Sequence, residues 1–290
     1  MTLQQAVQQG TKLLEEALVT APRLTAEVLL SHAIGCRREW LYGHSTDELK
    51  EVWWIHYGRY LHERLKGKPT QYITRVQEFY GRDFHVSPAV LIPRPETEHL
   101  VEEALKRLTD GPVVDVGTGS GAIAVTLALE SKRRVYYACD LSAEALAVAR
   151  WNAVNLDARV MFMQGDLLAC VAPRSMGMVV SNPPYIRLNE RAGLAVEVRE
   201  HEPHVALFGG EDGFDIYRPL IVQAAQVLRA GGWLLMELAY NGAPGVEAML
   251  SGSGLWRNIE ICNDLAGHPR VVAARLHPNP HLNAGDFDPA

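Results

Sequence analysis

From residue 93 onward, the chain alternates short apolar runs with helical stretches. The apolar runs predict strands at residues 113–116, 135–139, 160–163, 178–180, 233–237 and 271–274, with helices between them, for example at 121–129 and 143–152. Strands that alternate with helices are typical of βαβ units, in which neighbouring strands run parallel. The pattern therefore predicts an α/β fold with a doubly wound, mostly parallel sheet.

A glycine-rich loop follows the first predicted strand and begins a helix. Its sequence is Asp115-Val116-Gly117-Thr118-Gly119-Ser120-Gly121. Glycines let a backbone approach a ligand closely, and the first turn of a helix offers unpaired N–H groups. We therefore predict a nucleotide-type cofactor held by Gly117, Thr118, Gly119, Ser120 and Gly121. With Ala122 the loop also fits G-x-G-x-x-A, so a dinucleotide remains an alternative.

Two further acidic residues follow the next two predicted strands. Asp140 is placed to accept hydrogen bonds from ribose hydroxyls, which NAD and S-adenosylmethionine share, and Asp166 suits an adenine amino group or a cation. Each has an alternative role as a helix cap. Carboxylates gathered near one site favour a sulfonium cation over a pyrophosphate, which requires positive charge or bare N–H groups. We therefore expect S-adenosylmethionine as cofactor and S-adenosylhomocysteine as its product.

Asn182-Pro183-Pro184-Tyr185 ends the fourth predicted strand, at the sheet edge where α/β folds bind ligands. The prolines lack N–H groups and hold their carbonyls still, the asparagine amide adds an acceptor, and the tyrosine offers a flat face. This combination suits a planar –NH2 group, although Asn-Pro also starts ordinary turns. We assign catalysis and substrate binding to all four residues, and we assign cofactor binding to Asn182 as well. Because the motif holds no titratable base, we expect catalysis by positioning.

The first 75 residues have apolar positions at helical spacing, and residues 76–92 alternate in polarity around Gly81, as a β-hairpin does. We predict a helical substrate-docking domain (1–75), a hairpin connector (76–92), a catalytic domain (93–277) and a loose tail (278–290). Residues 1–92 carry 11 Lys and Arg against 10 Asp and Glu, a net +1, whereas the remaining residues carry 17 against 24, a net −7. Such an acidic half is a poor footprint for nucleic acid.

Other features narrow the class of protein. The N-terminus lacks a signal-peptide pattern and no apolar run reaches 18 residues, so we expect a cytoplasmic protein without membrane contact. The four cysteines form no C-x-x-C pair, which predicts reduced, buried thiols. His201 and His204 flank Glu202-Pro203, but no third ligand is evident, so we expect no metal site.

These motifs together resemble the peptide-chain release factor glutamine N5-methyltransferases, a family of class I S-adenosylmethionine-dependent enzymes. The likeness runs from about residue 20 to residue 275 and rests on the glycine loop and on N-P-P-Y. It also rests on narrower matches, namely L-T-A-E-V-L-L (24–30), E-F-Y-G (78–81), L-I-P-R-P-E-T-E (91–98), E-P-H-V-A-L (202–207) and D-L-A-G-H-P-R (264–270). One departure is Ala239-Tyr240-Asn241, where the family pattern has glycine and then glutamine after Glu237.

The resemblance implies a seven-stranded sheet and methylation of the glutamine side-chain amide in the Gly-Gly-Gln loop of class I release factors. It assigns the cofactor to residues 117–121 and Asp140, and the glutamine amide to Asn182–Tyr185. Residues 93–98 would close over the methyl donor, with Glu98 near the sulfonium. Two other classes stay open: an adenine N6-methyltransferase acting on DNA or RNA, since N-P-P-Y also grips a flipped adenine, and an NAD-linked oxidoreductase or non-catalytic binding module.

Overall fold

The computed structural model describes residues 1–132 and 134–278. The chain forms two compact units: Met1–Val76 with Ala195–His201, and Gln77–Leu194 with the chain from Glu202 onward. The segment 195–201 thus joins the helical unit, although the sequence predicts a continuous catalytic domain from residue 93. The predicted tail, apart from Pro278, lies outside the described residues.

The first unit is helical. Its helices are α1 (Leu3–Glu16), α2 (Pro22–Ile34), α3 (Arg38–Gly43), α4 (Glu51–Leu65), α5 (Thr70–Thr74) and α9 (Val196–His201). Thr2 and Gln5 form a capping box at the start of α1, and α2 begins at a proline and ends at Gly35 in the left-handed region. The apolar faces of α1, α2 and α4 meet in a core that includes Leu14, Leu30 and Tyr57, all fully buried. Burial of these faces holds the short helices together.

A two-stranded hairpin, β1 (Val76–Phe79) and β2 (Arg82–His85), follows the helices. Phe79 and Phe84 are fully buried and meet edge to face, with ring centroids 6.0 Å apart. The buried side chain of Asn152, in α8 (Ala143–Asn155), accepts from the His85 N–H at 2.7 Å and donates to the His85 carbonyl at 3.0 Å. The hairpin is therefore anchored to the α/β unit by a side chain that completes its backbone hydrogen bonding.

The α/β unit is built on one seven-stranded sheet. In spatial order its strands are β5 (Val160–Gln164), β4 (Tyr136–Asp140), β3 (Val113–Val116), β6 (Met176–Ser181), β7 (Leu228–Glu237), β9 (Pro269–Leu276) and β8 (Trp256–Asn263). The first five are parallel, while β9 is antiparallel to both β7 and β8. The predicted doubly wound, mostly parallel fold is confirmed. The apolar runs indicated six of these strands and did not indicate β8.

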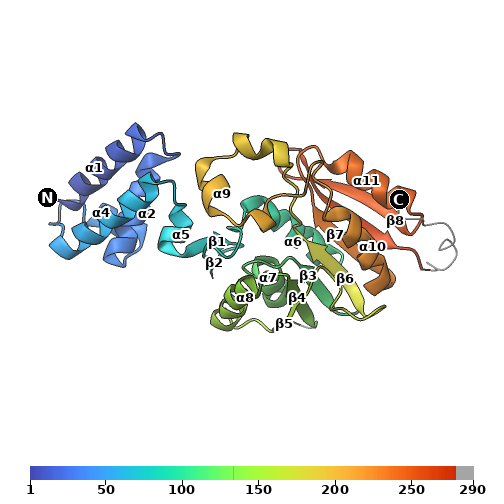
Figure 1. The fold of residues 1–290 in the computed structure, drawn as a ribbon. Helices are drawn as coiled ribbons and strands as arrows, with labels where there is room; N and C mark the ends of the chain where they lie inside the picture. Colours follow the sequence, from blue (N-terminus) through green and yellow to red (C-terminus); the bar gives the residue numbers. More distant parts are fainter. Residues whose placement is uncertain (133, 279–290) are drawn as a thin grey trace. The chain divides into compact units, whose positions relative to one another are not determined.

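Helices cover both faces of this sheet (Figure 1). Along β7, Leu234 and Met236 pack with α10 (Tyr217–Val227) and α11 (Ala243–Gly252), whereas Trp233 and Leu235 pack with the helices of the other face. The helices of that other face are α6 (Glu98–Lys106), α7 (Ala122–Glu130) and α8. The chain also has three short 3₁₀ helices among the described residues, η1 (Pro95–Thr97), η2 (Leu188–Gly193) and η3 (His204–Ala206). Successive strand residues point to opposite faces, so each strand contributes to two cores.

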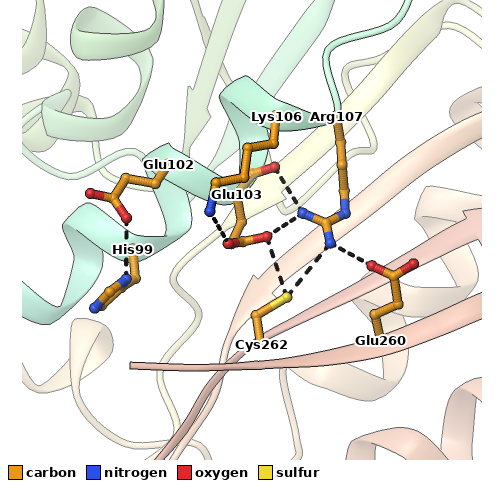
Figure 2. Close-up of polar contacts among 7 residues, drawn as sticks. All are labelled: His99, Glu102, Glu103, Lys106, Arg107, Glu260 and Cys262. Carbon is orange, nitrogen blue, oxygen red and sulfur yellow. Dashed lines mark hydrogen bonds and ion pairs between the residues drawn. The ribbon is translucent and has the colours of Figure 1, made fainter. Parts of the chain in front are cut away.

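A cluster of polar side chains joins α6 to the edge strand β8 (Figure 2). The Arg107 guanidinium pairs with both Glu103 and Glu260, and the Cys262 thiol donates to Glu103 at 3.4 Å. The guanidinium also lies 5.6 Å from the Trp233 ring centroid. One arginine thus links an outer helix to two strands through charge-assisted bonds and a cation–π contact.

All four cysteines are free, but their burial differs from the expectation. Cys139 is buried in β4, Cys36 and Cys262 are half-buried, and Cys170 is exposed in the turn that follows β5. The prediction of buried thiols is therefore wrong for Cys170, because a turn at the end of a strand leaves its side chain in solvent. Within the described residues, no helix is long and apolar enough to cross a membrane.

Candidate cofactor and amide-binding site

A cavity lies at the carboxyl ends of the parallel strands, within the α/β unit. Residues that follow β3, β4, β5 and β6 line it, including Gly117, Gly119, Asp140, Asp166, Asn182, Pro183 and Pro184. The strand order reverses between β3 and β6, and open α/β sheets bind ligands in the crevice at such a point. The topology therefore brings the glycine loop (117–121) and the N-P-P-Y turn (182–185), which are distant in sequence, to one site.

The three glycines of the loop have two different tasks. All three have positive φ: +68° at Gly117, +55° at Gly119 and +82° at Gly121. A Cβ on Gly117 or Gly119 would meet no atom of the described residues within 4 Å, so these two present bare backbone to open space. A Cβ on Gly121 would lie 3.1 Å from the Ala149 Cβ, so this glycine permits α7 and α8 to pack closely. The first two glycines are available to a ligand, and the third supports the fold.

Asp140 connects the glycine loop to the next helix. One carboxylate oxygen accepts from the Gly119 N–H and the other from the Ser142 N–H, both at 2.9 Å. Each oxygen keeps a lone pair for a further donor. The described residues that line the cavity include Asp140 and Asp166 but no lysine, arginine or histidine. A cation suits such a lining better than a pyrophosphate does.

Asp115 lies beneath the loop and is 1% exposed. Its Oδ2 accepts from the Thr118 hydroxyl at 2.6 Å and from the Ala124 N–H at 3.3 Å, while Oδ1 has no hydrogen-bond partner among the described residues. Burial raises the pKa of Asp115 to about 7 despite these donors, with the charge of Asp140 adding to the rise. Thr118 and Ser120 are also buried, and neither lines the cavity. The Thr118 hydroxyl bonds to Asp115 within the protein.

The N-P-P-Y turn is divided between cavity and core. Asn182, Pro183 and Pro184 line the cavity, whereas Tyr185 does not; its ring packs against the core and its hydroxyl donates to Glu237 at 3.4 Å. Burial raises the pKa of the Tyr185 hydroxyl, and the Glu237 charge adds to the rise. A Cβ on Gly209 would lie only 2.6 Å from the Pro184 carbonyl oxygen. That carbonyl is therefore covered by the chain itself, which leaves the Asn182 amide and the Pro183 carbonyl as the acceptors of the turn.

The segment before α6 contributes to the site differently from the expectation. The Thr97 hydroxyl accepts a hydrogen bond from Asn182 Nδ2 at 3.1 Å. Glu98, expected near the sulfonium, instead accepts from the Tyr80 N–H at 2.8 Å in the hairpin turn and does not line the cavity. Val90 and Leu91, a few residues upstream, line it. The upstream segment thus forms part of the wall, while Glu98 holds the hairpin.

Glu202 connects the segment before α6 to a second segment that lines the cavity. It is 4% exposed, pairs with Arg94, and accepts from the Ile92 N–H at 3.3 Å. Pro203, directly after it, lines the cavity, as do Val205 and Ala206. A buried carboxylate that has both a charged and a backbone partner holds its surroundings firmly.

Two polar residues behind the cavity were not assigned a role from the sequence. Thr97 and Glu237 are 5% and 1% exposed, and they contact the side chains at the two ends of the N-P-P-Y turn. Glu237 follows the apolar run Trp233–Met236, and a charged residue at the end of a buried strand is a signal for a functional group. Thr97 gives no comparable signal, because its burial depends on the fold.

Comparisons with known proteins agree with this architecture. Residues 5–74 match the family model described as PrmC N-terminal domain, and residues 95–199 match the methyltransferase small domain. A solved structure of a methyltransferase from Pyrococcus furiosus has a TM-score of 0.51 at 18% identity, and the likeness covers 68% of this chain and 90% of that chain. The sheet topology and these matches define a Rossmann-like methyltransferase.

Sequence relatives identify the methyltransferase family to which the chain belongs. The release factor glutamine methyltransferase of Koribacter versatilis is 47% identical over 279 residues, which cover 95% of this chain and 99% of the relative. That of Nitratidesulfovibrio vulgaris is 42% identical over 280 residues, which cover 94% and 95%. The chain belongs to the release factor glutamine methyltransferase family, as its motifs predicted.

Proposed function

We propose that this protein transfers a methyl group from S-adenosylmethionine to the side-chain amide nitrogen of the glutamine in the Gly-Gly-Gln motif of class I peptide-chain release factors. The observation that carries the proposal is one cavity that joins a glycine loop to the Asn182–Pro184 turn, in a chain 47% identical to a release factor glutamine methyltransferase. Adenine methylation is less well supported, because the named relatives act on release factors.

The residues around the cavity fit a nucleoside that carries a cation. Gly117 and Gly119 offer backbone beside open space, Asp140 retains acceptor capacity for ribose hydroxyls, and Asp166 adds negative charge. A dinucleotide is less suited, because the described residues that line the cavity provide no positive side chain for a pyrophosphate. When bound, S-adenosylmethionine supplies an electrophilic methyl carbon.

The N-P-P-Y turn suits the nitrogen of an amide. An amide nitrogen is a weak nucleophile because its lone pair is delocalised into the carbonyl. Asn182 Oδ1 and the Pro183 carbonyl can each accept one of its two hydrogens, which fixes the N–H bonds and favours a pyramidal nitrogen whose lone pair faces the donor. Such alignment contributes up to roughly 7–11 kcal/mol in favourable systems. No histidine is among the described residues that line the cavity, which supports catalysis by positioning with late loss of the proton to solvent.

The proposal is tested by incubating the protein with S-adenosylmethionine and a class I release factor, followed by tandem mass spectrometry. One methyl group is expected on the glutamine of the Gly-Gly-Gln loop, and none on a release factor in which that glutamine is alanine. Equal transfer to the alanine variant would rule out the proposed acceptor. The identity of the cofactor is tested separately by calorimetric titration with S-adenosylmethionine and with NAD. Only S-adenosylmethionine is expected to bind.

A further inference from the structure

The turn between β8 and β9 is held rigid by one carboxylate. Asp264 Oδ1 accepts from the backbone N–H groups of Ala266 and His268, at 3.0 and 2.9 Å. Its Oδ2 accepts from Arg270 Nη2 at 3.0 Å. The Gly267 N–H closes the turn on the Asp264 carbonyl at 2.9 Å, with Gly267 at φ +84°. A turn fixed in this way has little conformational freedom left to lose when it binds a partner.

This rigid turn presents an apolar side chain to solvent. Leu265 is 99% exposed in the turn, and Tyr240, which follows β7, is 67% exposed. The Tyr240 ring meets the His268 ring edge to face, with the centroids 5.0 Å apart. Single exposed apolar side chains are common on proteins. These two differ from such residues because the same rigid turn carries one of them and packs against the other.

The β8–β9 turn lies at the same edge of the sheet as the N-P-P-Y turn. Ser181, the last residue of β6, pairs with Met236 of β7, and the next residue of β7, Glu237, pairs with Val271 of β9. Because β9 is antiparallel to β7, the turn that precedes β9 lies beyond the carboxyl end of β7. The strand order β6-β7-β9-β8 and a spacing of roughly 4.8 Å per strand put this turn on the order of 10–14 Å from the end of β6.

That separation is smaller than the footprint of a bound protein. Tyr240 and Leu265 do not line the cavity. A specific protein interface covers roughly 800 Å² on each partner, which is a patch about 30 Å across. A folded protein that inserts a loop as far as Asn182 therefore extends over the ends of β7, β9 and β8.

The chemistry of the turn suits a protein surface. The Arg270 side chain is 15% exposed and is paired with Asp264 at 3.0 Å, so it is a poor contact for a phosphate backbone. Tyr240 and Leu265 offer apolar surface instead, and tyrosine is enriched among the residues that dominate protein interfaces.

We propose that Tyr240 and Leu265 form a docking contact for the folded part of the release factor that carries the glutamine loop, and that they fill an apolar recess beside that loop. This inference rests on the proposed function, because the occupant is the protein whose glutamine enters the cavity. It goes further by giving a role to Tyr240, which falls where the sequence departs from the family pattern.

Steady-state methyl transfer, with saturating S-adenosylmethionine and a varied concentration of release factor, tests this contact. Tyr240→Ala and Leu265→Ser are each expected to raise the KM for the release factor about tenfold, since each loses apolar area that the complex buries. The kcat at saturating release factor and the calorimetric affinity for the cofactor are expected to match the wild type.

Val154→Ser is the matched control. Val154 is 79% exposed and lies near the end of α8. That helix begins after the carboxyl end of β4 and leads back to Val160, the first residue of β5, which pairs with Tyr136, the first residue of β4. Val154 therefore lies toward the opposite edge of the sheet, and Val154→Ser is expected to leave the KM unchanged.

The kinetic outcomes separate the docking contact from the proposed function. A KM like that of Val154→Ser in either variant overturns the role of that residue, while methylation by the wild type leaves the proposed function standing. A fall in kcat without a rise in KM also overturns the contact, because the defect then follows binding. A wild type that methylates no release factor contradicts the proposed function.

Photo-crosslinking tests the contact without methyl transfer. With p-benzoylphenylalanine at position 265, the protein is expected to crosslink to the release factor in the domain that carries the glutamine loop, and with the same group at position 154 it is not. A crosslink from position 265 supports the contact even where no methyl group is transferred. Crosslinking to a second copy of this chain, or equally from both positions, overturns it.

Discussion

Arg94 and Glu202 lie 108 residues apart in the sequence and form an ion pair between two segments that line the same cavity. The glutamate side chain is 1% exposed and the arginine side chain 33% exposed. A pair of this kind is costly to break, because the buried partner has no access to water.

Glu202→Gln is expected to weaken the attachment between these two segments, because the charge that pairs with Arg94 is removed. We expect a loss of about 1–2 kcal/mol in the free energy of unfolding and about a tenfold loss of affinity for S-adenosylmethionine, measured by urea denaturation and calorimetry. Asp212→Asn is the matched control, since Asp212 pairs with Arg218 where both side chains are about half exposed. That change is expected to cost less than about 1 kcal/mol. Equal effects of the two substitutions would contradict the role of Glu202.

Gly119→Ala separates backbone strain from ligand approach. Gly119 has φ +55°, and a Cβ there would meet no atom within 4 Å in the part of the chain that the structure describes. Gly35 at the end of α2 has φ +79° and equally open surroundings, but it lies far from the glycine loop in the sequence. Both alanine variants are expected to lose about 1–2 kcal/mol of stability from strain. Only Gly119→Ala is expected to lose cofactor affinity, by at least about tenfold (~1.4 kcal/mol); unchanged binding in that variant would show that no ligand approaches the loop.

Asp115 is expected to make stability fall as pH rises. Its pKa in the folded protein, about 7, is above the ordinary value near 3.8, so between these values the folded state holds a proton that the unfolded chain has released. The free energy of unfolding therefore decreases with pH across that window and levels off above it. Asp115→Asn mimics the protonated side chain and removes this contribution. Relative to wild type, the variant should gain stability from pH 5 to pH 8, by a few kcal/mol at most, in urea denaturation; a difference independent of pH would contradict the raised pKa.

Cys262 is expected to resist alkylation. Burial, followed by its hydrogen bond to Glu103, raises the pKa of this thiol to about 11. At pH 8 roughly one molecule in a thousand then carries the reactive thiolate. Glu103→Gln removes a group that raises the pKa and leaves the Arg107 cation, which lowers it, so labelling by iodoacetamide should accelerate. Mass spectrometry of the labelled peptide measures the rate, and slower labelling in the variant would refute the assignment.

The sequence was sufficient for the parts of the fold that bury continuous apolar runs. Strands such as β3, Val113–Val116, are buried on every residue and are therefore visible as uninterrupted hydrophobic segments. The edge strand β8 is not, because it alternates in exposure and its pairing is irregular between Arg257 and Glu260, with Asn258 at φ +49°. The sequence of an edge strand that carries charged residues and a bulge resembles the sequence of a loop.

The sequence places the glycine loop and Asn182 at the ends of parallel strands, and the structure brings both to one cavity. The direction of individual side chains is not specified by the motifs. The strand ends identified the glycine loop and Asn182, since parallel strands end at one edge. The direction of Tyr185 is decided by the core and by Glu237, and that of Glu98 by the Tyr80 N–H of the hairpin. Such contacts join residues distant in sequence, so a local motif does not specify them.

The proposed role of Asn182, which is to accept a hydrogen bond from the glutamine amide of the substrate, is tested most directly by single-turnover methyl transfer to a release factor at pH 8, with S-adenosylmethionine saturating. Saturation with S-adenosylmethionine removes any effect of cofactor affinity from the measured rate. Asn182→Ala is expected to lower this rate by about 10² or more, the loss typical of one fixed hydrogen-bonding group at a reacting centre, with a circular dichroism spectrum like that of the wild type. A rate within about threefold of wild type (~0.6 kcal/mol) would contradict the account.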